Sequence, residues 1–218
     1  MKKIAFILAG CGAQDGSEIQ EATLALYALS LANIEVQAFA LAKTQCHTVN
    51  HQNATVQEGV ERLQIEEAAR IVRGNIKPIE ELDVAQFDAL FIPGGTGTAK
   101  NFFTFALDGV DFSVEPQYRK VVEAFHSAGK PIAAMCIAPL SLCAIISGVA
   151  ITLGPAEQLA EAAMEKYGAK VTEVGREGVV VDTENKVLTT ASYMYGDSTV
   201  ANIGEGAKNL VAELLNMM

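Results

Sequence analysis

The sequence contains no tryptophan and few cations, and both absences exclude classes of function. Lysine and arginine number 16 against 26 aspartates and glutamates, which gives a formal net charge of −10 at pH 7. A chain this acidic repels the phosphates of nucleic acids and of anionic membranes. The 5 tyrosines and 9 phenylalanines suggest no platform for stacking bases. We therefore expect no nucleic acid and no membrane among its partners.

Paired cysteines are also missing. The four cysteines form no C-x-x-C motif and have no disulfide-like spacing; they are Cys11, Cys46, Cys136 and Cys143. Such cysteines are typical of reduced thiols in a cytoplasmic protein. The spacing of Cys136 and Cys143 places both on one face of a helix, so we expect Cys143 to belong to the core.

The histidines and glycine loops give no pattern typical of a metal or a nucleotide cofactor. Cys46, His47 and His51 are close in sequence, but no carboxylate is spaced with them as a further ligand. No loop reads G-x-G-x-x-G or carries a Walker lysine. We expect neither a metal nor a cofactor. His51 lies in the irregular segment 43–55, and a long loop can fold over a site. It is therefore a candidate substrate contact.

Two apolar segments resemble targeting or membrane sequences. Residues 1–11 look like a short lipoprotein signal, but its apolar region is too short. We therefore interpret residues 3–9 as a buried strand. The uncharged stretch 131–156 could reach across a membrane. Its prolines, glycines and serines divide it into strand, helix and strand instead.

Strands and helices alternate along the chain, which predicts an α/β fold. We predict buried strands at 3–9, 34–40, 88–92 and 131–135, and helices at 18–33, 56–71, 115–128, from 137, at 155–167 and at 197–216. A capping-box pattern, Ser17 with Gln20, marks the start of the first helix. Segments 178–182 and 186–190 should pair as a hairpin. The pattern predicts one domain, 1–218, built on a doubly wound, mostly parallel sheet with helices on both faces and one antiparallel hairpin.

Cys136 stands where a predicted strand turns sharply into a predicted helix. The run is Pro131-Ile-Ala-Ala-Met-Cys-Ile-Ala-Pro139, and proline is tolerated in the first turn of a helix. A residue on such a turn projects from the carboxyl edge of the sheet, as a nucleophile elbow does. We expect the helix end to lower the pKa of this thiol. The alternative is a buried cysteine that acts only as a small hydrophobe.

Two further segments should meet Cys136 at the same sheet edge. Glu18 and Glu21 open the first helix on one face, and Glu21 is the better candidate for a semi-buried proton carrier. Glu18 is equally explained as a charge that favours a helix N-terminus. Gly94 and Gly95 offer backbone N–H groups for an oxyanion, although an ordinary glycine turn has the same sequence.

These motifs together resemble the ThiJ/PfpI superfamily, whose fold is class I glutamine amidotransferase-like, or flavodoxin-like. The matching segments are Gly10-Cys-Gly12, Asp15-Gly-Ser-Glu-Ile-Gln-Glu21, Pro93-Gly-Gly-Thr-Gly-Thr-Ala-Lys-Asn101 and Ala134-Met-Cys-Ile-Ala-Pro139. Further segments resemble the ElbB branch, the isoprenoid-biosynthesis glyoxalase: Val49-Asn-His51, Ala69-Arg-Ile-Val-Arg-Gly-Asn-Ile76, Val181-Asp182 and Thr189-Thr-Ala-Ser-Tyr-Met194. The resemblance covers nearly the whole chain.

The resemblance implies a cofactor-independent glyoxalase-type lyase. Cys136 would be the nucleophile, Glu21 its hydrogen-bonded carboxylate, and Gly95 and Ile137 the oxyanion donors. Small 2-oxoaldehydes would be the substrates, glyoxal giving glycolate and methylglyoxal giving lactate, and the protein would be a homodimer. The alternatives are a protein deglycase, a non-enzymatic redox-sensing or chaperone-like dimer whose Cys136 oxidises to a sulfinate, and a module that only binds a small ligand.

Departures from related patterns narrow the function. Thr96 stands where the branch leads us to expect phenylalanine, and Ser192 where we expect proline, so the pocket should differ in shape. Glutaminases of this fold have glycine on both sides of the cysteine and a downstream His–Glu pair. Here no histidine follows Cys136. Peptidases of the superfamily have histidine directly after the cysteine, where this chain has Ile137. Both activities are disfavoured.

Overall fold

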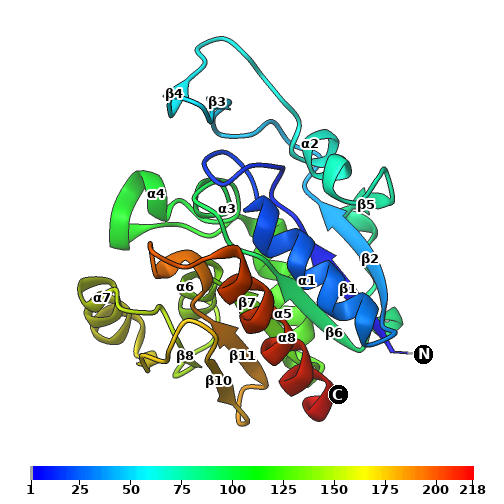
Figure 1. Ribbon diagram of the computed structural model, residues 1–218, viewed down its shortest axis with the longest axis vertical. Coiled ribbons are helices and arrows are strands. Elements are labelled where there is room, and N and C mark those ends of the chain that lie inside the picture. The colour runs from blue at the N-terminus through cyan, green and yellow to red at the C-terminus, as the bar shows by residue number, and fades with distance from the viewer. Residues whose placement is uncertain (1) are drawn as a thin grey trace.

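A seven-stranded sheet runs through the molecule (Figure 1), and the computed structural model describes residues 2–218. Its strand order is β10-β11-β7-β6-β1-β2-β5. The strands are β1 (Lys3–Ile7), β2 (Glu35–Ala40), β5 (Ile76–Pro78), β6 (Ala89–Ile92), β7 (Ile132–Met135), β10 (Val179–Asp182) and β11 (Val187–Thr190). Neighbours are parallel except β10 and β11, which pair antiparallel as the predicted hairpin. The predicted fold class is confirmed.

Helices cover both faces of this sheet, because its central strands are apolar on both sides. The helices are α1 (Ile19–Leu31), α2 (Gln64–Ile71), α3 (Thr98–Asn101), α4 (Phe105–Asp108), α5 (Pro116–Ser127), α6 (Ala138–Cys143), α7 (Glu157–Tyr167) and α8 (Val200–Met217). Helices α1 and α8 pack side by side on one face, and α5 packs on β6 and β7 behind it (Figure 1). Short 3-10 turns occur at Ile79–Glu81, Val84–Gln86, Gly109–Asp111 and Ser192–Met194.

Two small sheets lie outside the central one. Strands β8 (Ala150–Ile151) and β9 (Lys170–Val171) pair parallel and flank α7. Strands β3 (Val49–Asn50) and β4 (Thr55–Val56) form a hairpin that stands above the carboxyl edge of the main sheet (Figure 1). Within residues 2–218, no helix combines the length and the apolar character needed to cross a membrane.

The predicted helix at 56–71 forms only in its second half, as α2. The preceding residues lie along segment 43–48 instead, where Arg62 O accepts from Gln45 N at 2.8 Å and Lys43 O accepts from Gln64 N at 2.9 Å. Gly59 interrupts any helix there, since its φ is +72°. The charged residues of 56–63 have a pattern typical of a surface helix, but their backbone hydrogen bonds with segment 43–48 determine the structure here.

The predicted cap of the first helix is also wrong. Ser17 is fully buried, and its Oγ accepts from Ala9 N at 2.9 Å, so it holds the end of β1. Glu18 caps α1 in its place, because its Oε2 accepts from Glu21 N at 2.7 Å. Helix α8 likewise begins later than predicted, at a capping box of Thr199 and Asn202.

Candidate active site

Cys136 occupies a strained turn between β7 and α6. Its φ is +59°, a left-handed conformation that costs free energy in any residue with a Cβ. The turn is held because Cys136 N donates to Thr190 O at 2.9 Å, which continues the pairing of β7 with β11. Pro139 lies in the first turn of α6. The predicted strand–cysteine–helix geometry is therefore present, and Cys143 is buried in the core.

Glu21 reaches this turn from α1 and is fully buried. Its Oε2 accepts from Gly94 N at 2.9 Å, and its Oε1 accepts from Tyr193 N at 3.4 Å. The carboxyl group lies beside the side chain of Cys136, so each of the two groups influences the pKa of the other. Three segments far apart in the sequence thus fix one carboxyl beside the thiol.

Burial controls the proton affinity of this pair. Burial, and after it the charge of the Glu18 carboxylate, raises the pKa of Glu21 to about 8. Burial also raises the pKa of the Cys136 thiol, and the charge of Glu21 adds to that effect. The backbone N–H groups of Gly95 and Ile137 act in the opposite sense. The expectation that the helix end lowers the pKa of this thiol is wrong, because burial outweighs the N–H groups.

The two predicted oxyanion glycines have different roles. The N–H of Gly94 donates to Glu21 Oε2, whereas that of Gly95 lies close enough to the Cys136 thiol to lower its pKa. A Cβ on Gly94 would lie 2.5 Å from Cys136 Cβ and 2.8 Å from Glu21 Oε2. Gly94 therefore allows the carboxyl and the thiol to approach, while Gly95 and Ile137 supply N–H groups at the sulfur.

A cavity of about 340 Å³ opens over Cys136. Its wall is mainly apolar, formed by Ala13, Ala99, Phe105, Ala106, Ile137 and Met194. Glu18, Thr96 and Tyr193 supply its polar side chains, and Gly95 and Cys136 its floor. Within residues 2–218 there is no cluster of three or more histidine, cysteine or acidic side chains arranged to hold a metal ion.

His51 is not part of this wall. Its Nδ1 donates to Val49 O at 3.1 Å, and its Nε2 accepts from Gln14 N at 3.2 Å. The bond to Val49 lies within the β3–β4 hairpin, and the bond to Gln14 attaches this hairpin to the loop after β1. His51 contacts Gln14, the residue next to Ala13 of the wall, and its role as a substrate contact stays a prediction.

Sequence reasoning missed part of the wall and one donor. Phe105 and Ala106 fall in a segment for which we predict no element, and nothing in their pattern indicates a pocket. Tyr193 contributes a main-chain N–H, which no side-chain pattern reveals. Ser192 has a φ of +47°, which proline cannot adopt, so the proline expected at this position would not fit the backbone of this chain.

A comparison of the sequence with protein-family models identifies the family of this chain. The model of the DJ-1/PfpI family matches residues 2–203. The chain belongs to the DJ-1/PfpI family. The predicted superfamily is therefore confirmed.

Named relatives and a solved structure match over almost all of the chain. "Glutamine amidotransferase-like class 1 domain-containing protein 3, mitochondrial" from Homo sapiens is 39% identical and covers 99% of this chain and 83% of its own length. "ES1 protein homolog, mitochondrial" from Rattus norvegicus is 38% identical, covering 99% and 84%. A crystal structure of an isoprenoid biosynthesis protein with amidotransferase-like domain from Ehrlichia chaffeensis is 33% identical, with a TM-score of 0.90 over 99% of this chain and 100% of that one.

Proposed function

We propose that the protein is a glyoxalase-type enzyme that converts small 2-oxoaldehydes into 2-hydroxy acids without a cofactor. The observation that supports this most is the position of the buried Glu21 carboxyl beside Cys136 on its strained turn. A nucleophile paired with a proton acceptor in a shielded cavity is the arrangement that covalent carbonyl chemistry needs.

In the first step, the Glu21 carboxylate accepts the proton of the Cys136 thiol as the sulfur attacks the aldehyde carbon. A C–S bond forms, the carbonyl π pair moves to oxygen, and Glu21 returns its proton to that oxygen. The product is a hemithioacetal. The N–H groups of Gly95 and Ile137 stabilise negative charge at the sulfur and at the developing oxygen anion.

In the second step, Glu21 removes the proton from the carbon that bears sulfur. The electron pair shifts to the oxygen of the neighbouring carbonyl and gives an enediolate, and the hydroxyl proton of the sulfur-bearing carbon passes to that oxygen. Glu21 then returns its proton to the second carbon, which produces the thioester of a 2-hydroxy acid. Water cleaves the C–S bond to release the acid and the thiol. No electrons leave the molecule, because one carbon is oxidised while its neighbour is reduced.

Replacement of the pair tests the proposal. We expect Cys136→Ala and Glu21→Gln to lower kcat/KM for methylglyoxal at least about 100-fold, a size typical of the loss of a proton carrier or nucleophile. Cys46→Ala is the matched control, because Cys46 is an exposed thiol in the same chain. Circular dichroism checks folding. Methylglyoxal turnover that persists in Cys136→Ala contradicts the proposal.

The same assay separates the alternatives. Turnover of aldehyde adducts on a peptide, without turnover of free aldehydes, favours a deglycase. Selective oxidation of Cys136 by peroxide, without turnover of either substrate, favours a redox sensor.

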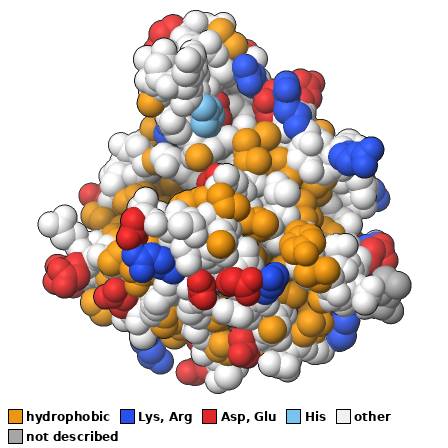
Figure 2. Space-filling view, viewed as in Figure 1, with side chains coloured by type: hydrophobic (Ala, Val, Ile, Leu, Met, Phe, Trp, Pro, Cys, Tyr) orange, Lys and Arg blue, Asp and Glu red, His pale blue; other side chains and the backbone are white. Residues whose placement is uncertain are grey.

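We also infer that the chain belongs to the ElbB branch and acts in the cytoplasm as a homodimer. The similarity to the Ehrlichia isoprenoid biosynthesis protein supports the branch. The four free cysteines support a reducing compartment, although the relatives named above are mitochondrial. Exposed apolar side chains gather over α1 and α8 (Figure 2), among them Ile19, Tyr27, Leu31 and Val200. Light scattering of the purified chain tests the dimer.

A further inference from the structure

We propose that the cavity selects 2-oxoaldehydes whose second substituent is apolar and larger than methyl, an aryl or branched alkyl group, and that Glu18 discriminates against substrates with a negative charge. This inference rests on the proposed function of Cys136. It names the class of substrate which that site takes.

The size of the cavity is the first argument. Its volume is about 340 Å³. Pockets of about 300–1,000 Å³ hold ligands of drug size. Glyoxal and methylglyoxal have only two and three carbon atoms, so either would leave most of this space to water. A substrate with an aryl or branched group would fill it and displace that water.

The chemistry of the wall is the second argument. Phe105 and Met194 line the cavity together with alanine and isoleucine side chains. A phenyl ring and a thioether both make favourable contacts with an aromatic group. Phe105 and Ala106 belong to α4, so their side of the wall is separate from the turn that carries Cys136. A bound substituent can therefore extend from the sulfur toward α4.

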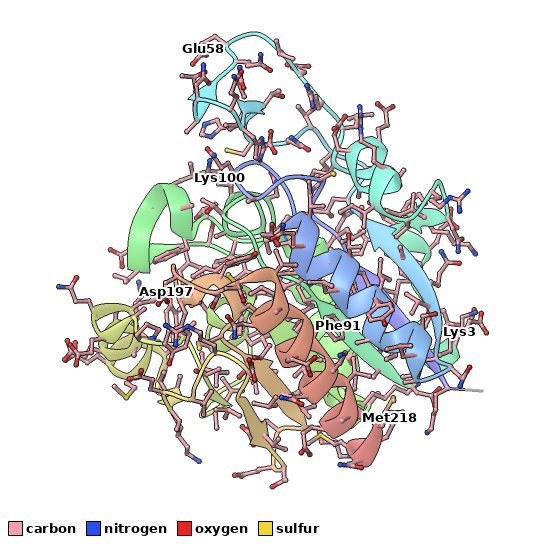
Figure 3. The ribbon with its side chains drawn as sticks, in the orientation of Figure 1. Lys3, Glu58, Phe91, Lys100, Asp197 and Met218 are labelled. Carbon is pink, nitrogen blue, oxygen red and sulfur yellow. The ribbon has the colours of Figure 1, made fainter. Side chains whose placement is uncertain are left out.

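The charge of the wall is the third argument. Glu18 is partly buried in the wall, and its carboxylate is held there because it caps α1 through Glu21 N at 2.7 Å. No lysine or arginine lines the cavity among residues 2–218. Lys100 follows Ala99 of the wall, but its Nζ donates to Gln14 O at 2.9 Å, and Figure 3 shows it beside the loop above α3. An anionic substituent would meet a carboxylate and no cation, which is unfavourable at short range in a partly buried site.

Glu18 is therefore a specificity determinant as well as a helix cap. Its carboxylate lies one helical turn from Glu21, and both face the same sheet edge. Removal of the Glu18 charge should relax discrimination between neutral and anionic substrates of one size. It should leave the preference for apolar bulk in place, because that preference comes from the volume and from α4.

Steady-state kinetics with three aldehydes tests both parts. The probes are methylglyoxal, 4-methylphenylglyoxal and 4-carboxyphenylglyoxal, and the last two differ mainly in charge. We expect kcat/KM for 4-methylphenylglyoxal to exceed that for methylglyoxal by at least about tenfold, as extra apolar groups in a fitting pocket do. We expect 4-carboxyphenylglyoxal to be at least about tenfold poorer than its neutral counterpart, and Glu18→Gln to reduce that gap several-fold.

Two further variants make the test specific. Thr96→Phe should lower the preference for the aryl aldehyde over methylglyoxal, because Thr96 is an exposed part of the wall and phenylalanine would occupy cavity space. Glu35→Gln removes the same charge at the start of β2, the opposite edge of the sheet from the site, and should leave the charge gap unchanged. The rate measured with Cys136→Ala is subtracted as the background of the aldehyde assay.

A readout that needs no turnover separates this inference from the proposed function. Iodoacetamide and iodoacetate are neutral and anionic alkylating agents, and mass spectrometry can compare their rates at Cys136 with those at the exposed Cys46. We expect iodoacetate to be disfavoured at Cys136 relative to Cys46, and Glu18→Gln to reduce the difference.

The outcomes are distinct. If no aldehyde is turned over but alkylation shows the Glu18-dependent charge effect, the proposed function fails and the selectivity of the cavity stands. If methylglyoxal is turned over at least as well as the aryl aldehyde, the size argument is overturned. If neither kinetics nor alkylation responds to charge, the role of Glu18 is overturned.

Discussion

Glu21 is a carboxyl group buried where water cannot stabilise its charge, and its hydrogen bonds to Gly94 and Tyr193 offset only part of that cost. The proton carried by Glu21 should therefore affect the stability of the fold and, in the proposed function, the rate of the reaction. Both effects can be measured.

The stability effect has a defined sign. The pKa of Glu21 rises from its ordinary 4.5 to about 8, so the folded protein holds this proton more tightly than the unfolded chain. The contribution of this proton to the free energy of unfolding is fully present below pH 4.5 and is lost as the pH rises through about 8. A pKa difference of one unit corresponds to about 1.4 kcal/mol. As the pH rises, we therefore expect the free energy of unfolding of the wild type to fall by up to about 5 kcal/mol relative to that of Glu21→Gln. Urea denaturation of both proteins from pH 4 to 9 measures this difference. If the free energies of unfolding of the two proteins change with pH in parallel, the prediction is contradicted.

The reaction should follow the same proton. Since Glu21 must be ionised to accept the thiol proton, we expect kcat/KM for methylglyoxal to rise with pH and to level off above a pKa of about 8. The Glu18 charge raises the pKa of Glu21, so Glu18→Gln should move the inflection to lower pH. A pH–rate profile of the two proteins checks this. An inflection that stays in place in Glu18→Gln would argue against coupling of the carboxyls.

At the scale of elements, the site depends on how closely α1, the loop after β6 and the turn after β7 approach one another. Gly94 lies at their meeting point, where a Cβ would be 2.9 Å from Met135 O, a backbone atom that cannot rotate away. The separation of these elements is thus set by the absence of one side chain.

Gly94→Ala should force these elements apart. We expect a loss of about 1–3 kcal/mol in the free energy of unfolding, the usual cost of overpacking. We also expect a fall in kcat/KM for methylglyoxal, because Glu21 moves away from Cys136. Gly175→Ala is the control, since no atom lies within 4 Å of its added Cβ. Equal stability of the two variants would show that the loop can yield without cost.

The segment that follows β1 depends on Ser17 in a similar way. Ser17→Ala removes the acceptor of the buried Ala9 N–H, and an unpaired buried donor costs about 1–3 kcal/mol. Ser30→Ala, on the exposed side of α1, should be close to neutral. Thermal unfolding of the two variants measures the difference. A Ser17→Ala protein as stable as Ser30→Ala would show that water replaces the hydroxyl.

For the whole molecule, the sequence predicts the architecture because apolar runs such as residues 3–9 and 88–92 can only be strands buried on both faces. The position of Cys136 follows from local rules, since proline early in a helix and an apolar strand before it define the turn. Glu21 and Gly95 come to Cys136 because parallel strands end at one edge.

Other parts of the site could not be predicted in this way. The wall from α4 and the N–H of Tyr193 depend on main-chain positions set by packing between distant segments. The sequence predicts the wrong direction for the pKa shift of Cys136, because the local pattern indicates the helix end but not the depth of burial. Segment 57–63 pairs with a loop that its own pattern does not identify.

The hydrogen bonds that hold the thiol turn and Glu21 reach almost to the end of the chain. Cys136 N pairs with Thr190, and Glu21 pairs with Tyr193, 172 residues further along. The ribosome makes the chain from its N-terminus, and a domain folds as a unit. A nascent chain therefore lacks the partner strand of β7 and one of the donors to Glu21 until β11 and Tyr193 have been made. The Cys136–Glu21 pair is thus assembled only after residues 187–193 have joined the sheet.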